Sequence, residues 1–147
     1  ILTARGSFAV VDSHGGDDNL PIFERQFLGG ARDLRGFQFR DIGPRDATGP
    51  NATQEVLGGA TSVFGSLEFT CPVIGQVRGA VFYDAGFVNS DSWDFNTGRL
   101  ASDVGIGVRL NLPGIGPLAV DFAVPVETPD DQADDGSQIQ FYMDYQF

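Results

Sequence analysis

The residues best suited to chemistry lie in one irregular segment, 28–46, which holds four arginines and three aspartates with Gly and Pro between them. A guanidinium can form two parallel hydrogen bonds to a carboxylate, so this composition indicates ion pairing. The turn-forming residues between the charges argue against a long helix or strand here. Because function often resides where a regular pattern breaks, this segment is the first candidate site.

Two other groups of residues have the right types for a reactive or metal-binding site but lack the spacing. Residues 12–18 contain aspartates, a serine and His14, without a nucleophile elbow or a second histidine. Residues 130–135 are acidic, without the spacing of a calcium-binding loop. We therefore predict solvated loops at both places, and we expect no enzyme activity, no catalytic residues, no metal and no cofactor.

The composition restricts the class of protein and its partners. The formal net charge is -11, which argues against a nucleic-acid partner, because such a partner needs a basic surface. The single Cys71 excludes an internal disulfide. The chain begins at Ile1 without a signal peptide, so we expect a mature piece or a fragment. The apolar runs are shorter than the roughly 18 residues of a membrane helix, which leaves membrane strands open.

Apolar and polar residues alternate with period two in six segments, which predicts six β-strands. One face of these strands is apolar, and the other carries charges in mid-strand. The predicted strands are 2–10, 60–69, 77–87, 100–110, 118–124 and 138–147, and the charges of the polar face are Glu68, Asp84, Asp103, Arg109, Asp121 and Asp144.

The connections between these strands alternate in length. Segments 70–76 and 111–117 are short, whereas 11–59, 88–99 and 125–137 are long. Transmembrane barrels show this asymmetry, with short turns on the periplasmic side and long loops outside. The predicted strand lengths, roughly 7 to 11 residues, also fit a tilted membrane crossing. The pattern therefore favours an antiparallel transmembrane β-barrel whose acidic loops face outward.

Several motifs resemble the C-terminal part of the barrel of the BamA-type outer-membrane protein insertases, a superfamily that includes TamA-like factors and two-partner secretion transporters. The resemblance covers essentially the whole chain. Its most specific part is segment 21–30 followed by Leu34-Arg35-Gly36-Phe37. Further matching segments are 42–45, 65–69, 77–86, 104–109 and 116–125.

The resemblance implies a fold and a set of site residues. It implies that the chain supplies the C-terminal six strands of a sixteen-stranded barrel, and that loop 11–59 inserts into the lumen. Six strands are too few to close a barrel, since about eight is the usual minimum. Arg35 would meet acidic residues of the inner wall, which correspond to Glu68 and Asp84. Gly36 would let the backbone pass closely, and Phe37 would pack beside it.

The last predicted strand resembles the terminal sorting signal of the family. Its apolar face carries Phe141, Met143, Tyr145 and Phe147, and the chain ends on an aromatic residue. The glycine often found within this signal is missing, and Asp144 stands near that place.

The function implied by the resemblance is the folding and insertion of β-barrel proteins into the bacterial outer membrane. The implied partners are unfolded barrel clients, outer-membrane lipids and accessory assembly lipoproteins. No pattern typical of the family's periplasmic POTRA domains occurs in the chain. Two alternatives remain open: a two-partner-secretion transporter of the same superfamily, and a soluble β-sandwich binding module of the cell surface.

Overall fold

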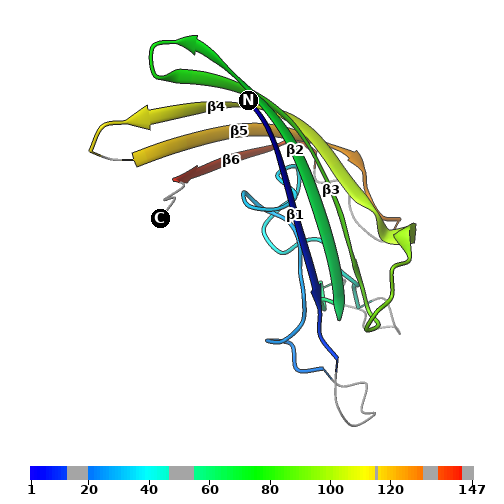
Figure 1. Cartoon of the computed structure of the whole chain (residues 1–147). Helices are drawn as coiled ribbons and strands as arrows, with labels where there is room; N and C mark the ends of the chain where they lie inside the picture. Colours follow the sequence, from blue (N-terminus) through cyan, green and yellow to red (C-terminus); the bar gives the residue numbers. More distant parts are fainter. Residues whose placement is uncertain (13–19, 47–54, 115, 131–135, 144–147) are drawn as a thin grey trace.

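The chain folds into one curved antiparallel sheet. The structure is a computed structural model that describes residues 1–12, 20–46, 55–114, 116–130 and 136–143. Six strands follow one another across the sheet in chain order, and the segment that joins the first two lies on its concave side (Figure 1). The strands are β1 (Leu2–Val10), β2 (Thr61–Ile74), β3 (Val77–Asn89), β4 (Ala101–Leu112), β5 (Gly116–Glu127) and β6 (Gln138–Met143); a short 3₁₀ turn, η1 (Thr97–Arg99), precedes β4.

The six predicted strands are confirmed, and several of them are longer than predicted. β1 has the predicted bounds, whereas β3 continues to Asn89 and β5 extends over both predicted ends. The predicted continuation of the last strand over 144–147 lies outside the described residues. No helix among the described residues is long and apolar enough to span a membrane.

The predicted short connection over 70–76 was wrong in extent. Residues 71–74 continue β2, and only Gly75 and Gln76 form the turn. Pro72 lies within β2 and pairs with Arg78 beside a register shift, a place where proline is tolerated because no regular ladder hydrogen bond is lost. The pairing of β1 with β2 reaches only as far as Phe69. Pro72 therefore lies on an edge of the sheet. The second predicted turn, 111–117, is shortened in the same way, because β4 and β5 extend into it.

A soluble protein buries the apolar face of a sheet and exposes the charged face, and in this sheet the reverse holds. On one face, apolar side chains are exposed, and Val81 and Ile106 are 52% and 62% exposed. On the other face, Asp84, Asp103 and Asp121 are completely buried. A soluble sandwich would bury the apolar faces against each other. The described residues instead leave them open, which argues against the sandwich alternative.

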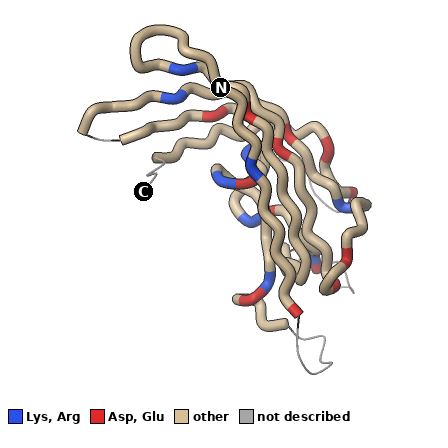
Figure 2. Tube along the Cα trace, in the orientation of Figure 1, with Lys and Arg blue, Asp and Glu red and all other residues tan. Residues whose placement is uncertain are grey.

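A small apolar core fixes the connecting segment to the sheet. Leu28, Leu34, Phe37 and Ile42 from the segment pack against Phe64, Val88 and Ala101 of the sheet region. Isolated bridges pair Leu28 with Ile42 and Arg45 with Val56 within the segment, which replaces a regular ladder by a few local contacts. Figure 2 shows charged positions on both the strands and this segment. The core therefore positions Arg35 of the segment over the charged face of the sheet.

Candidate functional site

Arg35 lies at the centre of the contact between the segment and the sheet. Its side chain is completely buried, and it makes five hydrogen bonds, which matches the five N–H groups of a guanidinium. Nε and Nη2 donate to the two carboxylate oxygens of Asp84 at 2.6 and 2.8 Å. Nη1 donates to Glu68 at 2.6 Å and to Asp121 at 3.1 Å, and Nη2 also donates to Ser66 at 3.2 Å. We call this set of contacts the arginine latch.

The electrostatics of the arginine latch favour a permanently charged Arg35. Burial alone would lower its pKa, but hydrogen bonds to Asp84 and Glu68 and the charges of Asp84 and Asp121 outweigh that effect and raise the pKa above its ordinary value. A buried ion pair is favourable only when its remaining polar atoms also find partners. The five hydrogen bonds of Arg35 meet that condition.

The guanidinium also lies on an aromatic ring. The Cζ atom of Arg35 is 3.4 Å from the centroid of the Phe82 ring, within the range of a cation–π contact. Phe82 pairs across the sheet with Gly105. A Cβ atom at Gly105 would lie 2.2 Å from Phe82 Cζ, so the ring occupies space that only glycine leaves open. The stack of Arg35, Phe82 and Gly105 thus depends on the pairing register of β3 and β4.

Gly36 and Phe37 bring the backbone of the segment against the wall. A Cβ atom at Gly36 would lie 2.5 Å from Asp103 Cβ, so this close approach requires glycine. Phe37 is buried in the apolar core, and its carbonyl oxygen accepts a hydrogen bond from Gln140 Nε2 at 3.3 Å. The segment therefore contacts β6 as well as the central strands.

A second arginine, Arg109 of β4, extends the network. It donates to both oxygens of Glu68, at 3.3 and 2.8 Å, and it forms an ion pair with Asp121 through both of its terminal nitrogens. Tyr142 donates its hydroxyl to Asp121 at 3.0 Å. Glu68 and Asp121 are thus shared by two guanidiniums. Arg109 and Asp121 were predicted on the polar face, but their role as partners of the site was missed.

Asp103 differs from the other carboxylates of this face. It is completely buried and pairs directly with Asp84 across the sheet. Its two carboxylate oxygens make no well-aligned hydrogen bond among the described residues. The backbone N–H of Gly36 is nevertheless close enough to stabilise the negative charge of this carboxylate. Asp103 therefore contributes close packing under Gly36 rather than a hydrogen bond to Arg35.

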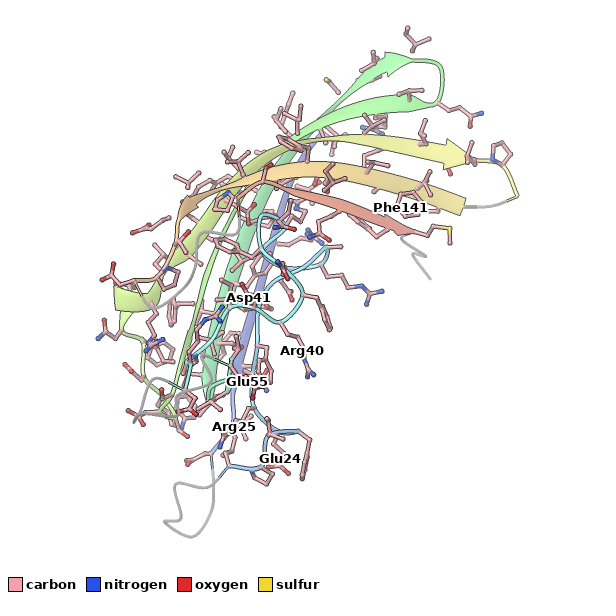
Figure 3. The ribbon with its side chains drawn as sticks, turned by 180° about the vertical axis from the view of Figure 1, so that it is seen from behind. Glu24, Arg25, Arg40, Asp41, Glu55 and Phe141 are labelled. Carbon is pink, nitrogen blue, oxygen red and sulfur yellow. The ribbon has the colours of Figure 1, made fainter. Side chains whose placement is uncertain are left out.

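The other arginines of segment 28–46 have different contacts. Arg45 forms an ion pair with Asp41 at 2.6 Å, and Arg40 lies over the rings of Phe27 and Phe39. Arg40 and Asp41 project from the segment on the side of the sheet seen in Figure 3. Of the predicted site residues, the structure brings Arg35, Gly36, Phe37, Glu68 and Asp84 together.

The predicted residues of the terminal strand lie on the opposite face. Phe141, labelled in Figure 3, is 64% exposed, and Met143 is 48% exposed. Tyr145 and Phe147 lie outside the described residues. Phe141 and Met143 thus belong to the exposed apolar face, away from the arginine latch.

Comparisons with known proteins agree with this geometry. The model of the Omp85 superfamily domain matches residues 1–147. The outer membrane protein assembly factor BamA of Nitratidesulfovibrio vulgaris is 31% identical over 139 residues, which are 92% of this chain and 17% of the relative. The crystal structure of BamA from Haemophilus ducreyi, lacking POTRA domains 1–3, matches with a TM-score of 0.75 and 29% identity. That match covers 94% of this chain and 30% of the solved chain, so the chain spans only a minor part of both proteins.

Proposed function

Because the chain belongs to the Omp85 superfamily, we propose that it serves in the folding and insertion of β-barrel proteins into the outer membrane. The chain is part of an integral protein of the bacterial outer membrane. The observation that carries the proposal is the agreement of the six-stranded sheet with the BamA barrel over almost the whole chain. The role is not enzymatic, and it needs no cofactor.

The six strands would form part of a larger closed barrel. We expect the remaining strands of a sixteen-stranded barrel to come from other parts of the parent protein. The exposed apolar face would then contact lipid acyl chains, and the charged face would line the lumen. This arrangement accounts for the exposure of Val81 and Ile106 and for the burial of Asp84 and Asp121.

The arginine latch would hold the connecting segment inside the lumen. Arg35 joins the segment to carboxylates on three different strands, β2, β3 and β5. Together with the apolar core, this side chain would hold the segment against the sheet. The role of Arg35 in this proposal is to support the barrel during assembly, without covalent chemistry.

The proposed partners follow from the membership of the Omp85 superfamily and the similarity to BamA. Unfolded outer-membrane β-barrel proteins are the proposed clients, and outer-membrane lipids are the proposed surroundings. The resemblance extends the expected partners to accessory assembly lipoproteins. A nucleic acid is not among them, given the net charge of -11.

The direct test is reconstitution of the parent protein in liposomes with an unfolded barrel client. We expect the parent protein to accelerate the appearance of the folded, heat-modifiable client on gels, relative to empty liposomes. The Arg35→Ala variant should lose most of this acceleration. No acceleration by the wild-type protein, together with passage of a secreted partner through the membrane, would favour the two-partner-secretion alternative instead.

A further inference from the structure

A second polar feature lies at the end of the sheet where the short turns are. A cavity of about 430 Å³ opens on the charged face there, and its lining comes from all six strands and one turn. Three arginines contribute to this lining, together with Glu68 at the boundary with the arginine latch. The uncharged polar residues around the arginines are Thr3, Gln76, Asn111 and Tyr142, and the arginines are Arg5, Arg78 and Arg109.

Arg78 is poorly satisfied within this cavity. It pairs directly with Arg109 across β3 and β4, so two like charges are opposite each other, an arrangement that destabilises a sheet. Its Nε is buried and has no hydrogen-bond partner in the described part of the chain. Its one hydrogen bond there runs from Nη2 to Thr70 Oγ1 at 3.4 Å, which is long.

The neighbouring arginines, Arg5 and Arg109, supply neither a hydrogen-bond acceptor nor a negative charge to Arg78. Arg109 is already bound to Glu68 and Asp121. Arg5 of β1 lines the cavity and has no ion pair with any carboxylate in the described ranges. A buried donor without a partner destabilises the fold, and the effect is larger when the group is charged. Arg78 therefore provides a hydrogen-bond donor that this part of the chain leaves unused. Arg5, whose charge also acts on Asp33 without forming an ion pair, adds positive charge to the cavity.

We propose that this cavity is a binding site for an oxyanion, and that its ligand is the carboxylate side chain of an acidic polypeptide segment. A carboxylate between Arg5 and Arg78 would accept from the free Nε and screen the repulsion between Arg78 and Arg109. The cavity lies on the face opposite the exposed apolar side chains. A polypeptide within the barrel reaches that face, whereas a lipid headgroup is held beside the apolar one. The site is separate from the proposed assembly activity, and its binding can be measured alone.

The test uses the parent protein in nanodiscs of neutral phosphatidylcholine. A short fluorescent peptide rich in glutamate is compared, by anisotropy, with a peptide that has glutamine at the same positions. We expect the glutamate peptide to bind and the glutamine peptide not to bind. Arg78→Gln and Arg5→Gln should each weaken binding by at least about tenfold, the loss expected for one charge-assisted hydrogen bond.

Arg99→Gln serves as the matched control, because it removes one arginine in η1, at the opposite end of the sheet. Its affinity for the peptide should equal that of the wild-type protein. Heat-shifted mobility on gels verifies that each variant is folded, and Arg78→Lys, which keeps the charge, replaces Arg78→Gln if the latter fails that check. Equal binding of the two peptides, or equal loss in Arg99→Gln, would refute the site. Binding of inorganic phosphate by the wild-type protein, without binding of either peptide, would refute the polypeptide ligand.

Discussion

Arg35 and Asp84 are joined by two hydrogen bonds, from Nε at 2.6 Å and from Nη2 at 2.8 Å, although 49 positions separate them in the sequence. This paired geometry fixes the plane of the guanidinium as well as its position. The other nitrogen, Nη1, is thereby directed toward Glu68 and Asp121. The contact between one loop residue and one strand residue therefore orients the whole arginine latch.

Replacing Arg35 by alanine should destabilise the barrel severely. The change leaves Asp84 buried without its cation and leaves Asp121 with Arg109 alone, and the removal of one partner of a buried ion pair costs about 3–5 kcal/mol. The measurement is the loss of heat-modifiable mobility and the urea midpoint of the reconstituted parent protein. Arg32→Ala is the control, because Arg32 is an exposed arginine of the same segment, and its effect should stay within about 0.5 kcal/mol. Equal effects of the two variants would contradict the role of Arg35.

Gly36→Ala should displace the segment from the wall. The added methyl group would lie 2.5 Å from Asp103 Cβ, so the backbone or the strand must move. Protease sensitivity of segment 20–46 should increase, with a loss of stability of about 1–3 kcal/mol. The double variant Gly36→Ala with Asp103→Gly removes the clash and should recover part of the loss. Additive effects of the two changes would show that these residues do not meet.

Gly105→Ala tests the support under the guanidinium. Its methyl group would lie 2.2 Å from Phe82 Cζ and 2.5 Å from a backbone oxygen of Phe122, so Phe82 cannot keep its place below Arg35. We expect a loss of about 1–3 kcal/mol in the free energy of unfolding. Gly65→Ala is a matched control in β2, because no atom lies within 4 Å of the added methyl group. It should be neutral, and similar losses in both variants would contradict the stacking role of Phe82.

Asp121→Asn should weaken the connection between β5 and the arginines. Asp121 accepts hydrogen bonds from Arg35, Arg109 and Tyr142. The amide keeps the size of the side chain but loses its charge and one acceptor, so a loss of about 1.5–3 kcal/mol is expected. Tyr142→Phe removes only one neutral donor and should cost less, about 0.5–1.5 kcal/mol. Urea unfolding of both variants gives the comparison, and the reverse order would be inconsistent with the observed geometry.

The sequence predicted which residues share a face, because the period of a strand is a local property. It therefore placed Glu68 and Asp84 on the polar face. Which of these charges meet depends on the register between strands, and that depends on turn lengths. The predicted connection over 70–76 was too long, because β2 continues through Pro72 at a place where no neighbouring strand needs its missing N–H. The involvement of Arg109 in the site was missed because it depends on the register that brings Arg109 to Glu68 and Asp121.

Arg35 was singled out through the motif that resembles the insertase family, since spacing alone does not distinguish it from the other arginines of the segment. Its contact with Phe82 needs the pairing of Phe82 with Gly105, a relation across two strands that no local pattern contains. Chemistry that depends on residue type was therefore predictable, and chemistry that depends on which strands meet was not.

The hydrogen bond from Gln140 to the Phe37 carbonyl has a mechanical consequence. β6 is attached to β5 by a ladder of six residue pairs, and it is attached a second time to the segment that carries Arg35. A force that pulls β6 away from the sheet is therefore shared between the ladder and this tether. Through Phe37, the load is transmitted to the neighbouring Gly36 and Arg35. Tension on β6 therefore reaches the buried arginine latch.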